Sequence, residues 1–154
     1  MNLMQSNCPF CNPSIVETAF ANGSGFYALY NHAPVVPGHS LIIPYKHVTS
    51  IFSLNDKEFN DLFLFCRKVI SFLNIYYSTN EFDMSLQEGF NAGQSVEHLH
   101  IHIIPRRAND LSMGQEWFHK LNEEKIGSLD SKNFLSSEEL NAISTKLREA
   151  WNKR

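Results

Sequence analysis

The sequence has few of the features that mark membrane, secreted or nucleic-acid-binding proteins. Its longest apolar runs, such as 41–43, are far too short to span a bilayer, and no charged segment followed by an apolar stretch stands at the N-terminus. With 13 Lys and Arg against 16 Asp and Glu, the net charge is -3, which offers no basic excess for polymeric nucleic acid. The three cysteines cannot all pair in disulfides. We therefore expect a cytoplasmic protein with reduced thiols and no membrane partner.

The chain also lacks internal repeats and the polar bias of disordered proteins. Hydrophobic residues make up 43% of its 154 residues, which is enough for a packed core. A chain of this length can bury close to ~70% of its unfolded surface as one unit. No change in composition suggests a linker. We expect a single domain over 1–154, with a core of about 8–107 and a C-terminal extension over 108–154.

Four segments have the composition of β-strands. The aromatic segment 26–30 follows a glycine-containing turn, and 40–44 ends at a proline. The segment 84–87 precedes a glycine-containing loop, and 97–105 has the strongest alternation. Because the strands resemble an antiparallel meander with helices inserted, an α+β fold is favoured over a parallel α/β sheet.

Residues 56–73 are predicted to form the longest helix. Asn55 and Glu58 can form a capping box at its first turn. Phe65 and Phe72 lie one heptad apart and outside the apolar stripe. Either a loop of the same chain or a second protomer could bury them. The stripe itself recurs at helical spacing and comprises Phe59, Leu62, Phe63, Cys66, Val69, Ile70 and Leu73.

Beyond residue 107 the sequence becomes more polar, and two further helices are predicted. One is a short helix around 115–122. The other begins at Ser136, where Glu139 stands three residues later and completes a second capping box. The side chains that this last helix is expected to bury are Leu140, Ile143, Leu147 and Trp151.

Histidine is the residue in excess, with seven in the chain and three of them within five positions. His98, His100 and His102 alternate with aliphatic residues. On a strand they would share one face at about 6.6–7 Å spacing, whereas a helix would scatter them. Such a row could bind a metal, supply a nucleophilic imidazole, or merely face solvent. The strict alternation favours chemistry.

The loop that precedes the histidines is rich in glycine, small residues and amides. Residues 88–95 can present main-chain N–H groups to anionic oxygens, and Gln94 and Ser95 add donors. Because the loop joins the histidine row directly, the two together predict a phosphate pocket with a nucleophile on its floor.

These segments resemble the histidine triad (HIT) family of nucleotide hydrolases and transferases. The signature His-φ-His-φ-His-φ-φ, in which φ is hydrophobic, is matched at 98–104, with Ala92–Val96 in front of it. Upstream, Asn31 and 36–41 match the strands of the nucleoside pocket. The resemblance covers about 8–107. It implies an α+β HIT fold with an antiparallel sheet of about five strands, one long helix and additional C-terminal helices.

The resemblance also implies roles for individual residues. His100 would attack the α-phosphorus of a nucleotide and form a nucleotidyl-histidine that water then cleaves. A main-chain carbonyl near His98 would accept the other ring N–H of His100. His102 would donate to the α-phosphate, and Gln94 and Ser95 would bind phosphate oxygens.

The same resemblance assigns the nucleoside pocket and a substrate class. Asn31 would contact the ribose, while Leu29 and Leu41 would flank the base with His39 nearby. Gln87 resembles the fragile-histidine-triad and diadenosine-polyphosphate-hydrolase branch, whereas the phosphoramidate-cleaving branch has Asn near that position. A dinucleoside polyphosphate is therefore the expected substrate. Whether Mg²⁺ accompanies it is left open.

A metal site is the second expectation. Cys8 and Cys11 have the spacing of two zinc ligands, although two ligands do not make a site. The resemblance to bacterial-type family members completes a structural zinc site with His47 and His98. If His98 binds zinc, it cannot also act as a free proton relay. Two ordinary thiols are the simpler alternative.

Rival functions remain at this point. A nucleoside phosphoramidase would use the same nucleophile with another leaving group. A nucleotide-binding or scaffold protein would have only incidental catalysis, and a zinc hydrolase would use the three histidines as ligands. The favoured prediction is a homodimeric hydrolase of nucleotide anhydrides.

Overall fold

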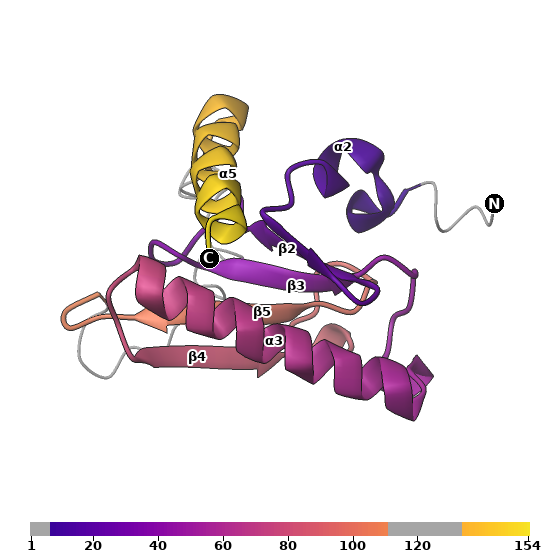
Figure 1. The fold of residues 1–154 in the computed structure, drawn as a ribbon. Coiled ribbons are helices and arrows are strands. Elements are labelled where there is room, and N and C mark those ends of the chain that lie inside the picture. Colours follow the sequence, from indigo (N-terminus) through magenta and orange to yellow (C-terminus); the bar gives the residue numbers. More distant parts are fainter. Residues whose placement is uncertain (1–6, 111–133) are drawn as a thin grey trace.

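In the computed structural model, which describes residues 7–110 and 134–154, one antiparallel sheet forms the centre of the molecule (Figure 1). Its strands are β1 (Ala21–Gly23), β2 (Phe26–Tyr30), β3 (Ser40–Pro44), β4 (Glu81–Leu86) and β5 (Ile101–Arg106). They lie in the order β1-β2-β3-β5-β4, and each neighbouring pair is antiparallel. The predicted α+β class with a five-stranded sheet is confirmed.

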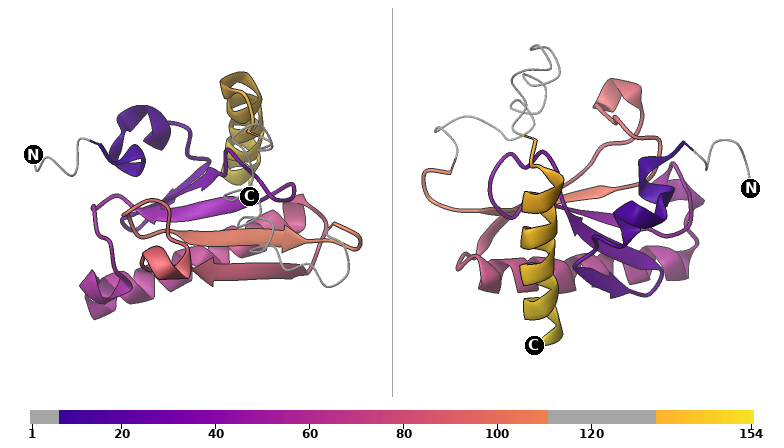
Figure 2. Two further views of the ribbon diagram at one scale, coloured as in Figure 1. Left: turned by 180° about the vertical axis from the view of Figure 1, so that it is seen from behind. Right: turned by 90° about the horizontal axis from the view of Figure 1, so that it is seen from above.

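Helix α3 (Asp56–Tyr76) runs along one face of the sheet (Figures 1 and 2). The predicted capping box is present, because the Glu58 N–H donates to Asn55 Oδ1 and the Asn55 N–H donates to the Glu58 carboxylate. Apolar side chains of this helix pack on β2, β3 and β5 to form the main core. The buried residues of α3 are Leu62, Phe65, Cys66, Val69, Phe72 and Leu73.

The predicted apolar stripe of this helix was partly wrong. Phe59 and Phe63 are 42% and 37% exposed, whereas Phe65 and Phe72 are buried. The last two pack edge-on against Trp151, with ring centroids 6.3 and 5.2 Å away. Trp151 belongs to helix α5 (Ser137–Asn152). A helix of the same chain therefore buries the two phenylalanines, in place of a loop or a second protomer.

Helix α5 passes from one face of the sheet to the other on the β1–β2 side (Figure 2). It begins with the predicted capping box of Ser136 and Glu139. Its Leu147 is fully buried in the main core. Arg148 secures it, because its Nε donates to the main-chain oxygen of Ala19 at 2.9 Å.

The opposite face of the sheet carries the N-terminal segment. A short helical turn η1 (Pro9–Cys11) leads into α2 (Pro13–Val16). The Tyr27 hydroxyl donates to the main-chain oxygen of Phe10 at 2.7 Å. Side chains of this segment pack on a second, smaller cluster of Ala19, Tyr27, Leu29, Leu41 and Ile43.

Further differences from the sequence predictions concern the strands. The strand predicted at 97–105 begins only at Ile101, since the Leu99 N–H donates to Val48 and not to a neighbouring strand. Strand β1 was not predicted. The helix expected around 115–122 lies outside the described residues. Among the described helices, none is both long and apolar enough to cross a membrane.

Candidate active site and metal cluster

A cavity of about 560 Å³ lies on the sheet face opposite α3. His102, which belongs to β5, lines this cavity, and so does His100, the residue just before β5. Both imidazoles are buried, and their centroids are 5.2 Å apart. The cavity wall also includes the predicted residues Leu29, Asn31, Leu41, Gln87 and Ser95.

The hydrogen bonding of His100 determines which of its nitrogens carries the proton. His100 Nδ1 lies 2.7 Å from the main-chain oxygen of His98. A carbonyl oxygen only accepts, so Nδ1 must donate and the neutral ring keeps the lone pair on Nε2. This is the tautomer that a nucleophilic imidazole needs.

A second histidine pair orients His102. His39 Nδ1 accepts from the Val35 N–H at 3.3 Å, so His39 Nε2 carries the proton. That nitrogen lies 2.8 Å from His102 Nδ1 and donates to it. The proton of neutral His102 is therefore on Nε2, where it can serve as a donor. Burial lowers the pKa of His39 to about 3, which keeps His39 neutral.

The remaining predicted residues take positions around this pair. Asn31 Nδ2 lies 3.3 Å from His39 Nδ1, and Asn31 Oδ1 accepts from the Ala33 N–H at 3.2 Å. His39 faces His102 and is not among the residues that line the cavity. Gln94 folds back across its loop, where its Oε1 accepts from the Gly89 N–H at 2.7 Å. Gly89, with φ of 87°, has backbone angles that favour glycine.

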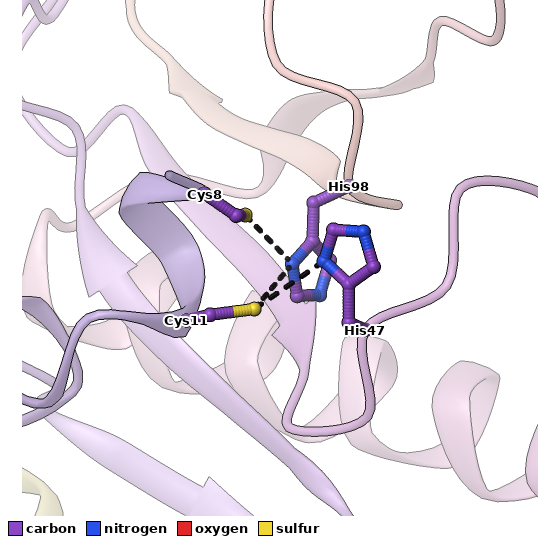
Figure 3. A group of neighbouring side chains, drawn as sticks. All are labelled: Cys8, Cys11, His47 and His98. Atoms are coloured by element: carbon purple, nitrogen blue, oxygen red, sulfur yellow. Dashed lines mark hydrogen bonds between the residues drawn. The ribbon is translucent and has the colours of Figure 1, made fainter. Parts of the chain in front are cut away.

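The four predicted metal ligands meet at one point beside the cavity (Figure 3). Cys8 directly precedes η1, and Cys11 is the last residue of η1. His47 follows β3, and His98 precedes β5. Their ligand atoms all lie within 4.8 Å of one another. His98 Nδ1 is 3.3 Å from Cys8 Sγ, and His47 Nδ1 is 3.3 Å from Cys11 Sγ.

The chemistry of this cluster fits a bound cation. His98 Nε2 donates to the main-chain oxygen of Pro44 at 2.9 Å, which leaves Nδ1 unprotonated toward the thiols. Burial lowers the pKa of His98 to about 4, so the ring is a neutral ligand. Burial and the adjacent Cys8 raise the pKa of Cys11 to about 11. Two thiolates here would therefore need a cation between them, and these residues could hold a metal ion.

The strand argument for His98 was wrong in one respect. Its side chain does not share a face with His100 and His102, because the chain enters β5 only after it. The side chain turns to the metal cluster, while its main-chain oxygen accepts from His100. Different atoms of His98 face the two sites, because Nδ1 faces the thiols and the main-chain oxygen faces His100.

Two sets of cavity residues were not predicted from the sequence. Phe10 stands between the two cysteines, and its ring packs edge-on to His98 and His100 at 5.9 and 5.3 Å. An apolar residue inside a Cys-x-x-Cys motif was the available signal. The other set, which no local pattern reveals, comes from the segment before α5 and from its first turn, and comprises Phe134, Leu135, Ser137 and Leu140.

A separate hollow of about 690 Å³ lies between α3 and the outer strand β4. Phe63 and Ile75 line it from the helix, and Phe82 and Met84 from the strand. All four are exposed. This apolar groove lies at the edge of the sheet, where β4 pairs with β5 on one side.

Comparison with known proteins gives concordant matches. The model of the family described as "HIT domain" matches residues 13–109. A bis(5'-adenosyl)-triphosphatase of Dictyostelium discoideum is 36% identical over 99 residues, which are 64% of this chain and 66% of that protein. An asymmetrical bis(5'-nucleosyl)-tetraphosphatase of Schizosaccharomyces pombe is 38% identical over 104 residues, 66% of this chain and 57% of that protein. The chain thus spans less than two thirds of the length of either relative.

Among solved structures, a similar one is the diadenosine triphosphate hydrolase of Plasmodium falciparum in complex with cyclomarin A. It superposes with a TM-score of 0.71 at 26% identity, covering 89% of this chain and 78% of that one. The predicted type of fold is therefore confirmed.

Proposed function

This chain belongs to the HIT domain family, and on that basis we propose that it hydrolyses dinucleoside polyphosphates at the α-phosphate. The observation that carries the proposal is the hydrogen bond from His100 Nδ1 to the His98 carbonyl, which prepares Nε2 for attack. The names of the two curated relatives support the substrate class.

The reaction has two balanced steps. His100 Nε2 attacks the α-phosphorus, the bond to the bridging oxygen breaks, and the remaining nucleotide departs with the electron pair. Water then attacks the phosphorus of the nucleotidyl-histidine and releases a proton to the solvent. The imidazole leaves with the electron pair of the P–N bond, and a nucleoside monophosphate is released. His102 Nε2–H donates to a non-bridging oxygen and stabilises its charge in both steps.

The other cavity residues hold the two ends of the nucleotide. Ser95 and the N–H groups of its loop bind phosphate oxygens, with Gln94 shaping that loop. Gln87 lines the same end. At the other end, Asn31 contacts the ribose, and the apolar wall formed by Leu29 and Leu41 receives the base.

Replacement of the nucleophile tests the proposal. His100→Gly should lower the turnover of diadenosine tetraphosphate by at least about a thousandfold, because covalent catalysis is lost. Product release is followed by chromatography, and circular dichroism checks that the variant is folded. Rapid alkaline denaturation of the wild-type protein during turnover should trap a nucleotide on His100, detected by mass spectrometry. Undiminished hydrolysis by the variant would overturn the mechanism.

The phosphoramidase alternative requires a direct comparison of substrates. Wild-type protein should cleave diadenosine tetraphosphate faster than an adenosine phosphoramidate at equal concentration. The opposite order would assign the chain to phosphoramidate cleavage. Tight nucleotide binding without any trapped intermediate would indicate a binding protein.

We propose zinc for the metal cluster. At standard bond lengths a tetrahedral zinc separates its sulfur and nitrogen ligands by about 3.6 Å. The observed separations are 3.3, 3.3 and 3.6 Å. Zinc there would hold the N-terminal segment on the sheet, and its reduced thiolates suit the cytoplasm. Any requirement for Mg²⁺ would come from the phosphates of the substrate.

We further propose a homodimer in which a second copy covers the apolar groove between α3 and β4. An outer strand with exposed apolar side chains is a surface on which chains associate. The groove lies on the α3 side of the sheet. A dimer formed there leaves the cavity of His100 and His102, here called the nucleotide cavity, open.

A further inference from the structure

The segment just before α5 contributes to an aromatic pair at one side of the cavity. The rings of His32 and Phe134 stack with centroids 5.1 Å and planes 15° apart. The Leu135 N–H donates to the main-chain oxygen of His32 at 2.9 Å, which joins the two segments. Both rings belong to the cavity wall. A segment outside the family match at 13–109 therefore contributes to the site.

The position of this pair in the sheet indicates which end of a nucleotide it would meet. His32 follows Asn31 just beyond β2, and α5 packs against β2. The catalytic histidines and the glycine-containing loop belong to β5 and its approach, two strands away. The pair is thus on the same side as the apolar wall of Leu29, at the nucleoside end. The departing phosphates would lie toward the loop on the other side.

We propose that Phe134, held by its stacking with His32, is a stacking surface for the base of the retained nucleoside and selects purines. This rests on the proposed function for the identity of the ligand. Phe134 is 46% exposed at the cavity wall, so part of its ring can still be covered. A base stacks on an aromatic ring through its π-face. A purine presents a larger face than a pyrimidine and gains more.

Binding of AMP measures this contact without requiring catalysis. Calorimetry on the full chain should show that Phe134→Ala weakens AMP binding by roughly 5- to 150-fold, the range found for loss of one base–aromatic stack. Phe134→Tyr should bind AMP nearly as well as wild type. Ribose 5-phosphate has no base, so Phe134→Ala should leave its affinity unchanged. The preference for AMP over UMP should shrink in the alanine variant.

A matched control is Phe52→Ala. Phe52 is 91% exposed and lies in η2 (Ile51–Ser53), away from the cavity, so its loss should leave AMP affinity unchanged. Thermal unfolding of each variant checks that the fold is intact. If Phe134→Ala weakens ribose 5-phosphate as much as AMP, the residue supports the cavity and the stacking inference is wrong.

The outcomes separate this inference from the proposed function. If wild type cleaves diadenosine tetraphosphate and Phe134→Ala binds AMP as tightly as wild type, the function stands and the stacking inference fails. A loss of kcat/KM for the dinucleotide with unchanged AMP binding would mean that Phe134 contacts the base of the departing nucleotide. That result would also contradict the inference, which concerns the retained nucleoside. If AMP binding falls as expected but wild type cleaves no dinucleotide, stacking stands and the proposed function fails.

Discussion

His98 contacts two sites because its side chain and its main chain point in different directions. Its Nδ1 faces the two thiols, and its carbonyl oxygen receives the Nδ1 proton of His100. A shift of this residue would disturb both the metal ligands and the tautomer of the proposed nucleophile. The four-residue metal cluster and the proposed nucleophile are therefore joined through the backbone of one residue.

His39 makes the stability of the fold dependent on pH. Its pKa is lowered to about 3 by burial, whereas an unfolded histidine has a pKa of about 6.5. Below 6.5 the unfolded chain takes up a proton that the folded chain does not, so stability is complete above that pH and is lost as pH falls toward 3. Between pH 6 and 4.5 this loss should be about 2 kcal/mol.

His39→Gln provides the measurement. Gln can still donate to His102 but has no proton to gain, so its free energy of unfolding should fall less between pH 6 and 4.5. Urea titrations of both proteins at the two pH values give the difference. Acid should affect the metal cluster equally in both proteins, so its contribution cancels when their losses of stability are compared. Equal losses in the two proteins would show that His39 does not titrate in this way.

At the scale of elements, the N-terminal segment packs on one face of the sheet. Tyr27 binds the main chain of Phe10, and the apolar side chains of α2 pack on the small cluster. A metal ion bound by Cys8 and Cys11, which flank Phe10, would add a further tie. Phe10 in turn packs against His100. Metal binding should therefore stabilise one wall of the cavity.

Removal of one ligand should release this tie. Cys11→Ser should lose bound zinc, and its free energy of unfolding should fall by about 3 kcal/mol or more, the value for a site filled at 100 times its Kd. Elemental analysis and unfolding with and without a chelator measure both effects. Cys66→Ala is the control, because Cys66 is buried outside the cluster and its loss should leave zinc content unchanged. Full zinc content in Cys11→Ser would contradict the assignment.

Helix α5 depends on one fully buried leucine. Leu147→Ala should lower the free energy of unfolding by about 2–5 kcal/mol, because it leaves a cavity among side chains of α3 and the sheet. Leu64→Ala is a matched control on the exposed side of α3, where Leu64 is 46% exposed. We expect that change to cost less than about 1 kcal/mol. Urea unfolding gives both values, and equal losses would show that α5 contributes little to the core.

At the scale of the whole molecule, the two faces of the sheet carry different parts of the structure. One carries α3 and the main core, and the other carries the N-terminal segment and the nucleotide cavity. Helix α5 joins them, since its Trp151 packs on α3 and its Leu140 lines the cavity. The apolar groove between α3 and β4 lies away from the cavity of His100 and His102 and is the surface that the proposed dimer would use.

The proposed dimer depends on that groove. Phe82→Asp should convert the dimer to a monomer, because a charge would be buried in an apolar interface. Light scattering coupled to size-exclusion chromatography measures the mass. Phe52→Asp, a change on an exposed residue away from the groove, should leave the dimer intact. A wild-type protein that is monomeric at micromolar concentration would refute the assembly.

Much of the fold could be predicted because its signals are local. Strands β2 and β3 have the predicted bounds, and both capping boxes are present as expected. Alternation and capping depend on residues within a few positions, so a sequence displays them directly. The metal ligands could be named from the family resemblance, although they lie up to 90 positions apart.

The sequence by itself therefore determined the class of fold, the long helix and the residue types of the site. Only the tertiary structure decided that His98 turns away from the histidine row, that Trp151 covers Phe65 and Phe72, and that Phe134 reaches the cavity. Each of these depends on segments far apart in the chain that meet only after the sheet has formed. No periodicity within one segment encodes such a contact, because the partner that decides it lies elsewhere.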